Sequence, residues 1–164
     1  MNQERDDGLR RRDFSEEGRS GNSGMKTLKL KSQLAELDRM RSFLRKYLKK
    51  LKISDKDYFK IELALLEICV NIIRYAYPQS NGDILIKAWH NEGKMFFEIR
   101  DSGVPFDPRK LKTPDIEESI RKEQTGGLGV FLSRSLMDGF DYKREDDQNI
   151  LTIYKNMKET GVSL

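Results

Sequence analysis

The chain has 164 residues, of which 37% are hydrophobic and 35% are charged, and its formal net charge at pH 7 is +4. This length suits one domain with its own core, and the chain has neither a run of about 18 apolar residues nor the apolar N-terminal stretch of a signal peptide, so we expect a cytoplasmic protein. The only cysteine, Cys69, excludes an intramolecular disulfide, and with a single histidine, His90, it argues against a zinc site.

The first 24 residues differ in composition from the chain that follows. The stretch "MNQERDDGLRRRDFSEEGRSGNSG" has mixed charge, four glycines and almost no apolar residues. Such a segment buries too little apolar surface to offset the entropy lost on ordering. We therefore predict a disordered tail over residues 1–24, a single domain over residues 25–158 and a short tail over residues 159–164.

A strand and two helices are predicted next. "MKTLKLKS" alternates apolar and polar residues, which is typical of a strand, and Ser32 is a candidate cap for the helix after it. That helix has apolar residues at spacings of three and four: Leu34, Leu37, Met40, Leu44, Leu48 and Leu51. Ser54 and Asp57 form a plausible capping pair for a second helix, which should run to about Tyr77, before Pro78.

Positive charge is concentrated in the first helix. Residues 25–60 contain twelve Lys or Arg and four Asp or Glu, and the densest part, residues 39–52, reads "RMRSFLRKYLKKLK". A basic amphipathic helix can bind nucleic acid, an acidic protein or a membrane surface. Aromatic residues do not alternate with the basic ones as in a base-stacking surface, so we favour a solvated helix face.

Two hairpins and a long loop are expected in the second half. "GDILIKAWHNEGKMFFEIRDSG" predicts two strands joined at Asn91-Glu92-Gly93. Residues 104–125 contain three prolines among many charges and predict a long loop, with a short helix from Pro114. A helix led by glycines follows, and "FDYKRE" and "NILTIYKNM" predict a closing hairpin.

The second helix carries a polar ridge between two apolar stripes. One stripe consists of Phe59, Leu66, Val70, Ile73 and Tyr77, and the other of Ile61, Leu65, Ile68 and Ile72. Glu67, Asn71 and Arg74 project together between them. They could form an ion-pair network around Glu67 and Arg74. Alternatively, the amide oxygen of Asn71 suits Mg²⁺, and Glu67 could take a proton from a group that attacks a phosphate.

Asp101 stands where a strand gives way to a loop, in "EIRDSGVPFDP". Asp-Ser-Gly is an ordinary turn sequence. A carboxylate at a strand end can also accept a hydrogen bond from an exocyclic amino group such as that of adenine. In that case Gly103 would let the ligand approach the backbone.

The stretch "RKEQTGGLGVFLSRSLMD" brings three glycines to the start of an amphipathic helix. It lacks the Gly-Lys-Ser/Thr ending of a P-loop, and it lacks the third glycine and the preceding strand of a Rossmann fingerprint. The glycines either form a flexible turn or clear side chains away from a helix N-terminus, where backbone N–H groups and the helix dipole favour a phosphate.

The order of these motifs resembles a known family. Glu67 and Asn71, then Asp101-Ser-Gly, a long loop and "GGLG" are similar to the nucleotide-binding boxes of the GHKL ATPase superfamily. Within it, "ELALLEICVNIIRYAYP", "RDSGVPFDP", "TGGLGVFLSRSLMDGFDYKRE" and "NILTIYKN" resemble the anti-sigma-factor serine/threonine kinases. The resemblance implies an α+β, two-layer sandwich (the Bergerat fold) in which about three helices cover one face of a mixed, largely antiparallel sheet.

The resemblance also implies a role for each site residue. Glu67 would be the catalytic base, Asn71 would coordinate Mg²⁺ on the ATP phosphates, and Asp101 would recognise the adenine amino group beside Gly103. Residues 104–125 would form a lid over the nucleotide. The backbone at Gly127, Leu128 and Gly129 would face the phosphates, and Thr125 and Gly126 are also implied to bind the nucleotide.

Three departures from the family pattern concern the nucleotide pocket. Ile72 and Tyr75 stand where relatives often have alanine and histidine, and Val104-Pro105 replaces a second glycine. None of these changes removes an implied ligand, but they bear on how closely the pocket fits adenine.

The function implied is that of a bacterial cytoplasmic kinase that phosphorylates a STAS-type anti-sigma-factor antagonist and regulates a sigma factor, with a homodimer expected and no membrane partner. One alternative is an ATP-gated protein-binding switch that transfers no phosphate. Another is a nucleic-acid-binding α+β domain that uses residues 39–52. A sensor histidine kinase is disfavoured because the only histidine, His90, falls in a predicted turn.

Overall fold

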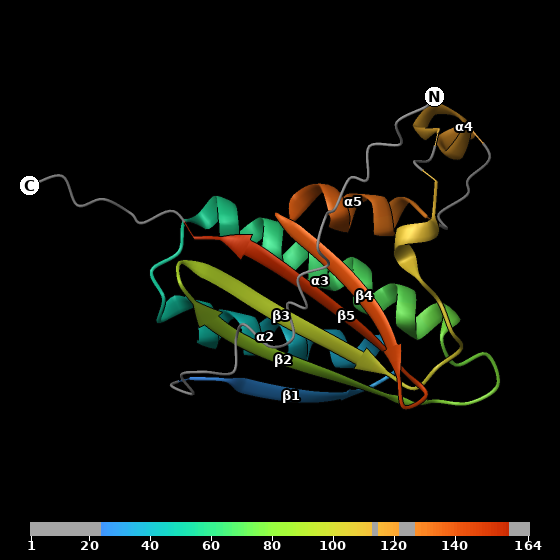
Figure 1. Ribbon diagram of the computed structural model, residues 1–164, viewed down its shortest axis with the longest axis horizontal. Helices are drawn as coiled ribbons and strands as arrows, with labels where there is room; N and C mark the ends of the chain where they lie inside the picture. Colours follow the sequence, from blue (N-terminus) through green and yellow to red (C-terminus); the bar gives the residue numbers. More distant parts are fainter. Residues whose placement is uncertain (1–23, 113–114, 122–126, 158–164) are drawn as a thin grey trace, which may run out of the picture.

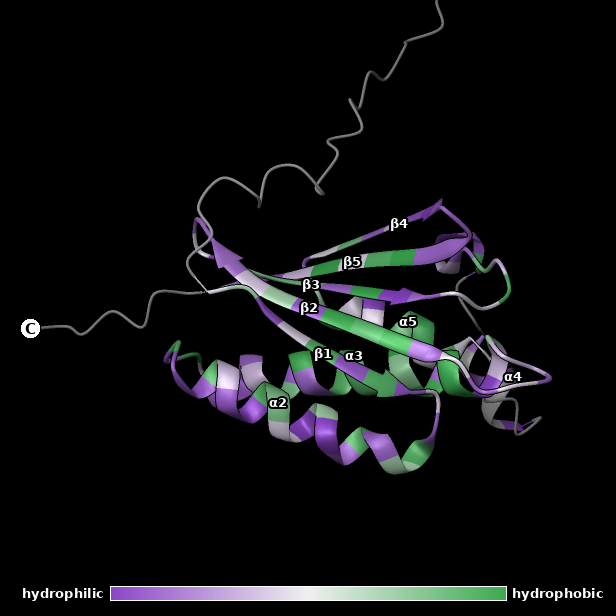
Figure 2. Cartoon of the chain, turned by 90° about the horizontal axis from the view of Figure 1, so that it is seen from below, coloured by the Kyte–Doolittle hydropathy of each residue, from purple (hydrophilic) through white to green (hydrophobic). Residues whose placement is uncertain are grey.

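The computed structural model describes residues 24–112, 115–121 and 127–157. These residues form two layers, a five-stranded sheet and a layer of helices that covers one of its faces (Figures 1 and 2). The expected α+β, two-layer class is confirmed. Most of the predicted N-terminal tail and the whole of the predicted C-terminal tail lie outside the described residues, so the predicted tails remain predictions.

The elements follow the predicted order along the chain. The strands are β1 (Lys26–Lys31), β2 (Asp83–Asn91), β3 (Lys94–Asp101), β4 (Gly139–Glu145) and β5 (Gln148–Asn156). The α-helices are α2 (Leu37–Lys49), α3 (Asp55–Tyr75), α4 (Ile116–Arg121) and α5 (Leu128–Leu136). Two short 3₁₀ helices are η1 (Leu34–Glu36) and η2 (Pro108–Lys110).

The strands lie in the order β1-β2-β3-β5-β4, and each neighbouring pair in the described sheet is antiparallel. The hairpin between β2 and β3 turns at Glu92 and Gly93, which both have positive φ, as the tight turns that suit strand twist require. The β4–β5 hairpin turns in the same way at Asp146 and Asp147. The register of β3 and β5 places Asp101 directly opposite Asn149.

The core lies between the sheet and the helices, and α3 runs through the middle of the helical layer (Figure 2). Alternate residues of β2 and β3 face the helices, and the inward set is Ile84, Ile86, Ala88, Met95, Phe97 and Ile99. Helix α2 contributes Met40, Leu44, Tyr47 and Leu48 at helical spacing. On the opposite face of the sheet, the rings of Trp89 and Phe96 stack with their centroids 5.3 Å apart.

Helix α3 begins as predicted. The hydroxyl oxygen of Ser54 accepts a hydrogen bond from the backbone N–H of Asp57 at 3.1 Å, which satisfies one of the free donors of the first turn. The helix ends at Tyr75, slightly before the predicted Tyr77. The hydroxyl of Tyr77 instead donates to the carbonyl of Asp83 and accepts from the N–H of Ser102, each at 2.8 Å, so this residue ties the end of the helix to β2 and β3.

Three sequence-based expectations are wrong. Ser32 does not cap the first helix, because its hydroxyl oxygen accepts from the N–H of Gly82 and joins β1 to the loop before β2. Phe59 does not belong to a buried stripe, since it is 60% exposed. His90 lies in β2 and not in a turn, and its Nδ1 is 3.3 Å from the hydroxyl of Tyr47.

Among the described helices, none is long and apolar enough to cross a membrane.

Candidate functional site

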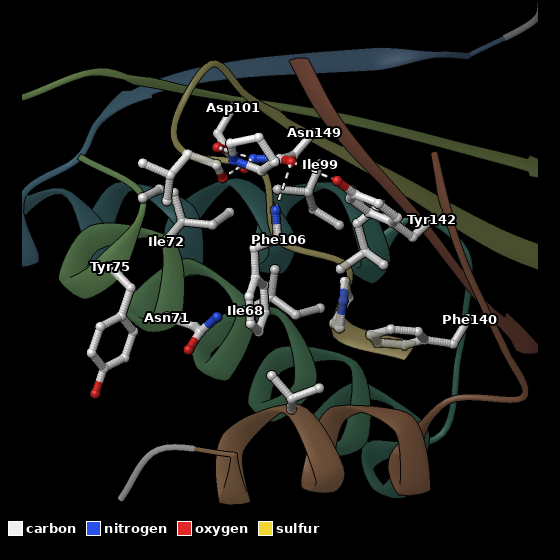
Figure 3. Close-up of a pocket in the computed structure, with 16 residues that line it drawn as sticks. Ile68, Asn71, Ile72, Tyr75, Ile99, Asp101, Phe106, Phe140, Tyr142 and Asn149 are labelled. Atoms are coloured by element: carbon white, nitrogen blue, oxygen red, sulfur yellow. Dashed lines mark hydrogen bonds between the residues drawn. The ribbon is translucent and has the colours of Figure 1, made fainter. Parts of the chain in front are cut away.

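A pocket lies between the second half of α3, the C-terminal end of β3, the N-terminal end of β5 and the first turn of α5 (Figure 3). Its walls are mostly apolar and include Ile68, Ile72, Ile99, Val130, Phe140 and Leu151. Its polar side chains are Asn71, Tyr75, Asp101, Tyr142 and Asn149. An apolar slot with a few convergent polar groups is the usual form of a site for a small organic ligand.

Asp101 supplies a carboxylate to this pocket from the last residue of β3. The residue is 6% exposed, and its Oδ1 accepts hydrogen bonds from the N–H of Gly103 and the Nδ2 of Asn149, each at 2.9 Å. Burial raises the pKa of the Asp101 carboxyl, and the two hydrogen bonds act in the opposite direction. Within the described residues Oδ2 accepts no hydrogen bond, so Asp101 keeps a free acceptor for a ligand that donates.

Gly103 has a packing role that the sequence did not predict. A Cβ atom at this position would collide with the backbone carbonyl of Ala76, just beyond the end of α3. The next residue, Val104, donates its N–H to that same carbonyl at 2.9 Å. Gly103 therefore lets the loop after Asp101 pack directly on the end of α3, and the expected approach of a ligand to this glycine is still a prediction.

Asn71 also lines the pocket, one helical turn after Glu67, and it projects from α3 beside Tyr75 (Figure 3). Arg74 is exposed, and the described chain contains no ion pair between Arg74 and Glu67. The ion-pair network that we considered for this ridge is therefore not present. The ridge instead directs an amide and a carboxylate toward the space next to α5.

The carboxylate of Glu67 lies against the first turn of α5. A Cβ atom at Gly129 would come within 2.5 Å of the Glu67 Oε2, so the glycine provides the room that this carboxylate occupies. The two helices are held together nearby by Ser133, whose hydroxyl lies 3.2 Å from the carbonyl of Ala64 on α3 and 2.8 Å from the carbonyl of Gly129. Gly129 thus has a packing role beside Glu67, and its predicted contact with the phosphates remains a prediction.

Gly127 immediately precedes α5 with a φ of 93°, a conformation that residues with a side chain rarely adopt. Among the residues that the structure describes, no side chain caps this end of the helix, and none has an atom within 4 Å of a Cβ built at Gly127. The N–H groups of the first turn of α5, including that of Leu128, have no acceptor within the helix and lie at its positive end. Thr125 and Gly126 lie outside the described residues.

A second pocket adjoins this helix end and shares Val130 with the first. Its lining includes Lys112, Gly127 and Arg134. Two cationic side chains beside an uncapped helix N-terminus create a positive region next to the apolar slot. Nothing in the sequence singled out these two cations, because their charges were inconspicuous in a chain with 31 Lys and Arg.

The first part of the predicted lid is fixed to β4. Arg109 in η2 pairs with Asp107 at 2.9 Å and with Asp141 of β4 at 3.0 Å, and its guanidinium lies over the ring of Tyr142. The predicted short helix is present as α4, while residues 113–114 and 122–126 lie outside the described residues. The role of residues 104–125 as a nucleotide lid remains a prediction.

The sequence analysis missed Asn149 and Tyr142. Both are buried in the site, and the hydroxyl of Tyr142 donates to the Oδ1 of Asn149 at 2.7 Å. The sequence contains a signal for Asn149. It is two and four residues before Leu151 and Ile153, so it lies on the same inward face of the strand. A polar residue on an inward apolar stripe requires a partner.

Comparison with known proteins agrees with this geometry. Residues 30–155 match the histidine kinase-like ATPase domain. The match covers most of the chain, and the chain therefore belongs to the family of histidine kinase-like ATPase domains.

The chain also resembles individual known proteins. The chain is 29% identical over 99 residues to the serine-protein kinase RsbW of Bacillus thuringiensis (strain Al Hakam) and to that of Bacillus cereus (strain 03BB102), a match that covers 58% of this chain and 62% of each relative. The crystal structure of the RsbU and RsbW domains of Rv1364c from Mycobacterium tuberculosis shares the fold, with a TM-score of 0.59 and 16% identity over 82% of this chain and 33% of that one. The resemblance to GHKL proteins of the anti-sigma-factor kinase type is thus confirmed.

Proposed function

We propose that this chain binds ATP with Mg²⁺ and transfers the γ-phosphoryl group to a serine or threonine of a protein substrate. The observation that carries the proposal is the convergence of distant parts of the chain on one cleft. Asp101 and Asn71 line the same pocket, and Glu67 lies one turn from Asn71 against the glycine-led start of α5. The family match and the relatives named as serine-protein kinases support the proposal.

The apolar slot fits a purine base. Side chains such as Ile72 and Leu151 would pack on its faces and exclude water. The free Oδ2 of Asp101 would accept a hydrogen bond from an exocyclic amino group, which adenine carries and hypoxanthine lacks. A buried acceptor discriminates strongly between these bases, because it stays unpaired when the donor is missing.

The opposite end of the cleft fits a magnesium-bound polyphosphate. Asn71 would hold Mg²⁺ through its amide oxygen, and the N–H groups of the first turn of α5, with Lys112 and Arg134 nearby, would hold phosphate oxygens. When bound, Mg²⁺ neutralises charge on the transferred group. Glu67 would take the proton from the attacking hydroxyl, since its carboxylate lies beside this helix end.

The partners are proposed from the same resemblance. We assign a STAS-type anti-sigma-factor antagonist as substrate, a sigma factor as the regulated partner and a second copy of the chain as a dimer mate, in the bacterial cytoplasm. Nucleic acid is not favoured as a partner. On the basic helix α2, Arg39 is paired with Glu36 at 2.6 Å, and Arg41 lies 3.7 Å from both Asp38 and Glu62.

Transfer of labelled γ-phosphate from ATP to STAS-domain proteins of the source bacterium tests the proposal. The Glu67→Gln variant keeps the size of the side chain and removes its basicity, so it should bind ATP as the wild type does and lose at least about 100-fold in transfer rate. Glu62→Gln is the matched control, because Glu62 lies on the same helix and faces Arg41. The control should transfer at the wild-type rate.

Three results would count against parts of the proposal. Wild-type transfer by Glu67→Gln would remove Glu67 from the role of base. ATP binding by the wild type without transfer to any STAS protein would favour the ATP-gated switch. Binding of DNA or RNA that weakens steeply with salt and ignores ATP would favour the nucleic-acid alternative.

A further inference from the structure

The side chain of Asn149 makes five hydrogen bonds with other described residues of the site. Its Oδ1 accepts from the hydroxyl of Tyr142 at 2.7 Å, from the Nη1 of Arg144 at 3.1 Å and from the N–H of Phe106 at 3.3 Å. Its Nδ2 donates to the Oδ1 of Asp101 and to the carbonyl of Val104, both at 2.9 Å. The residue is 6% exposed, so these bonds are sheltered from water.

This network fixes the orientation of the amide. Each of its three partners on the oxygen side is a donor, and both partners on the nitrogen side are acceptors. A flipped amide would place two donors against donors and an acceptor against the Asp101 carboxylate. The Nδ2 group of Asn149 is therefore held toward Asp101.

The position of Asn149 in the sheet makes this contact direct. The β3–β5 register pairs Asn149 with Asp101 across two neighbouring strands, and both side chains face the helical layer. The same amide also holds Val104 and Phe106, the first residues of the loop that leads to η2. One side chain thus links the proposed base acceptor to the beginning of the loop, as Figure 3 shows.

We infer that Asn149 is a positioning residue that occupies Oδ1 of Asp101, leaves Oδ2 as the acceptor for an exocyclic amino group, and thereby sets the preference of the site for 6-aminopurines. The inference rests on the proposed nucleotide function and goes beyond it. Without the amide, the Asp101 carboxylate keeps only the N–H of Gly103 as a hydrogen-bond donor and is free to rotate. The pocket then discriminates less strongly between bases with and without an exocyclic amino group, even if its shape is unchanged.

The test measures the ratio of the dissociation constants of ITP and ATP, since ITP carries a carbonyl oxygen where ATP carries the amino group. The wild type should bind ATP at least about tenfold more tightly than ITP, the value of one hydrogen bond to a charged group. In Asn149→Ala the ratio should fall to within about twofold of unity. Asn156→Ala, an exposed asparagine of the same strand, is the matched control and should keep the wild-type ratio.

Asn149→Asp provides a second readout that does not depend on the alanine variant folding. It keeps the shape of the side chain and its acceptors but replaces the donor with a carboxylate beside Asp101. The two like charges then favour uptake of a shared proton. ATP affinity of this variant should therefore rise relative to the wild type as the pH is lowered from about 8 to about 6, because a shared proton restores a donor to Asp101.

The outcomes separate the inference from the function on which it rests. A wild type that prefers ATP, together with an Asn149→Ala variant that weakens both nucleotides equally and keeps the ratio, would overturn the inference alone and leave Asn149 as a merely structural residue. The absence of an acid-dependent gain in Asn149→Asp would overturn it in the same way. A wild type that binds neither nucleotide would overturn the proposed function as well.

Discussion

At the scale of single residues, Gly129 leaves room for the carboxylate of Glu67. A methyl group at position 129 would lie 2.5 Å from the Glu67 Oε2, which is the far end of a flexible side chain and can move. Alanine also has a higher helix propensity than glycine by about 1 kcal/mol. We therefore predict that Gly129→Ala folds with unchanged or higher stability and loses most of its phosphoryl transfer, as thermal unfolding and a transfer assay would show.

Gly127→Ala is the contrasting variant, because a side chain there meets open space but the backbone has a φ of 93°. It should lose about 1 kcal/mol of unfolding free energy through backbone strain. If Gly129→Ala transfers phosphate at the wild-type rate, the Glu67 carboxylate does not need its present position and this interpretation of Gly129 is wrong.

The Asp101 carboxyl predicts a pH dependence of nucleotide binding. The ionised carboxylate would accept a hydrogen bond from the adenine ring's amino group. Burial raises the pKa of the Asp101 carboxyl above its ordinary value, whereas Asn149, Gly103 and Arg144 act to lower it. Because the folded pKa is raised, the ionised carboxylate costs folding stability above that pKa, and protonation removes this cost as the pH falls.

ATP affinity should accordingly decrease as the pH falls, starting at a higher pH than for an ordinary aspartate. Calorimetric titration at several pH values measures the decrease. Asp101→Asn serves as the control, since it retains only the titration of the nucleotide and of other groups. Parallel pH profiles for the two proteins would contradict the prediction.

At the scale of elements, the site depends on how three strand and helix ends are joined. The Tyr77 hydroxyl connects the chain just after α3 to the start of β2 and the end of β3. We predict that Tyr77→Phe lowers the free energy of unfolding by about 1–2 kcal/mol, because two hydrogen bonds are lost. Chemical denaturation measures the change.

Tyr75→Phe is the matched control for this prediction. Tyr75 is the last residue of α3, is 52% exposed, and its hydroxyl makes no hydrogen bond within the described chain. The control should change stability by no more than about 0.5 kcal/mol. Equal effects of the two substitutions would show that Tyr77 does not fasten these elements.

At the scale of the whole molecule, the sequence was most informative where local pattern and tertiary structure agree. The alternation in β2 and β3 and the Ser54 cap predicted elements that are present, because periodicity and capping are local properties. The prediction for Ser32 was wrong because a serine hydroxyl can also accept a hydrogen bond from a backbone N–H far away in the sequence, here that of Gly82. Only the folded structure distinguishes the two partners.

The site could be predicted only in part for a similar reason. Glu67, Asn71 and Asp101 stood out because their spacing matched a family, whereas Asn149 became visible only through the strand register that sets it opposite Asp101. The order β1-β2-β3-β5-β4 inserts the last strand next to β3, and no local pattern encodes that insertion. Contacts between distant segments therefore had to come from the structure.

The central claim is that one cleft holds both the base and the metal-bound phosphates of ATP. Titration of the wild type and of Asn71→Ala with ATP, with and without Mg²⁺, tests it most directly. We predict that Mg²⁺ strengthens ATP binding by the wild type and that Asn71→Ala loses this gain while its affinity for adenosine is unchanged. An equal gain from Mg²⁺ in both proteins, or no binding of ATP by the wild type, would contradict the claim.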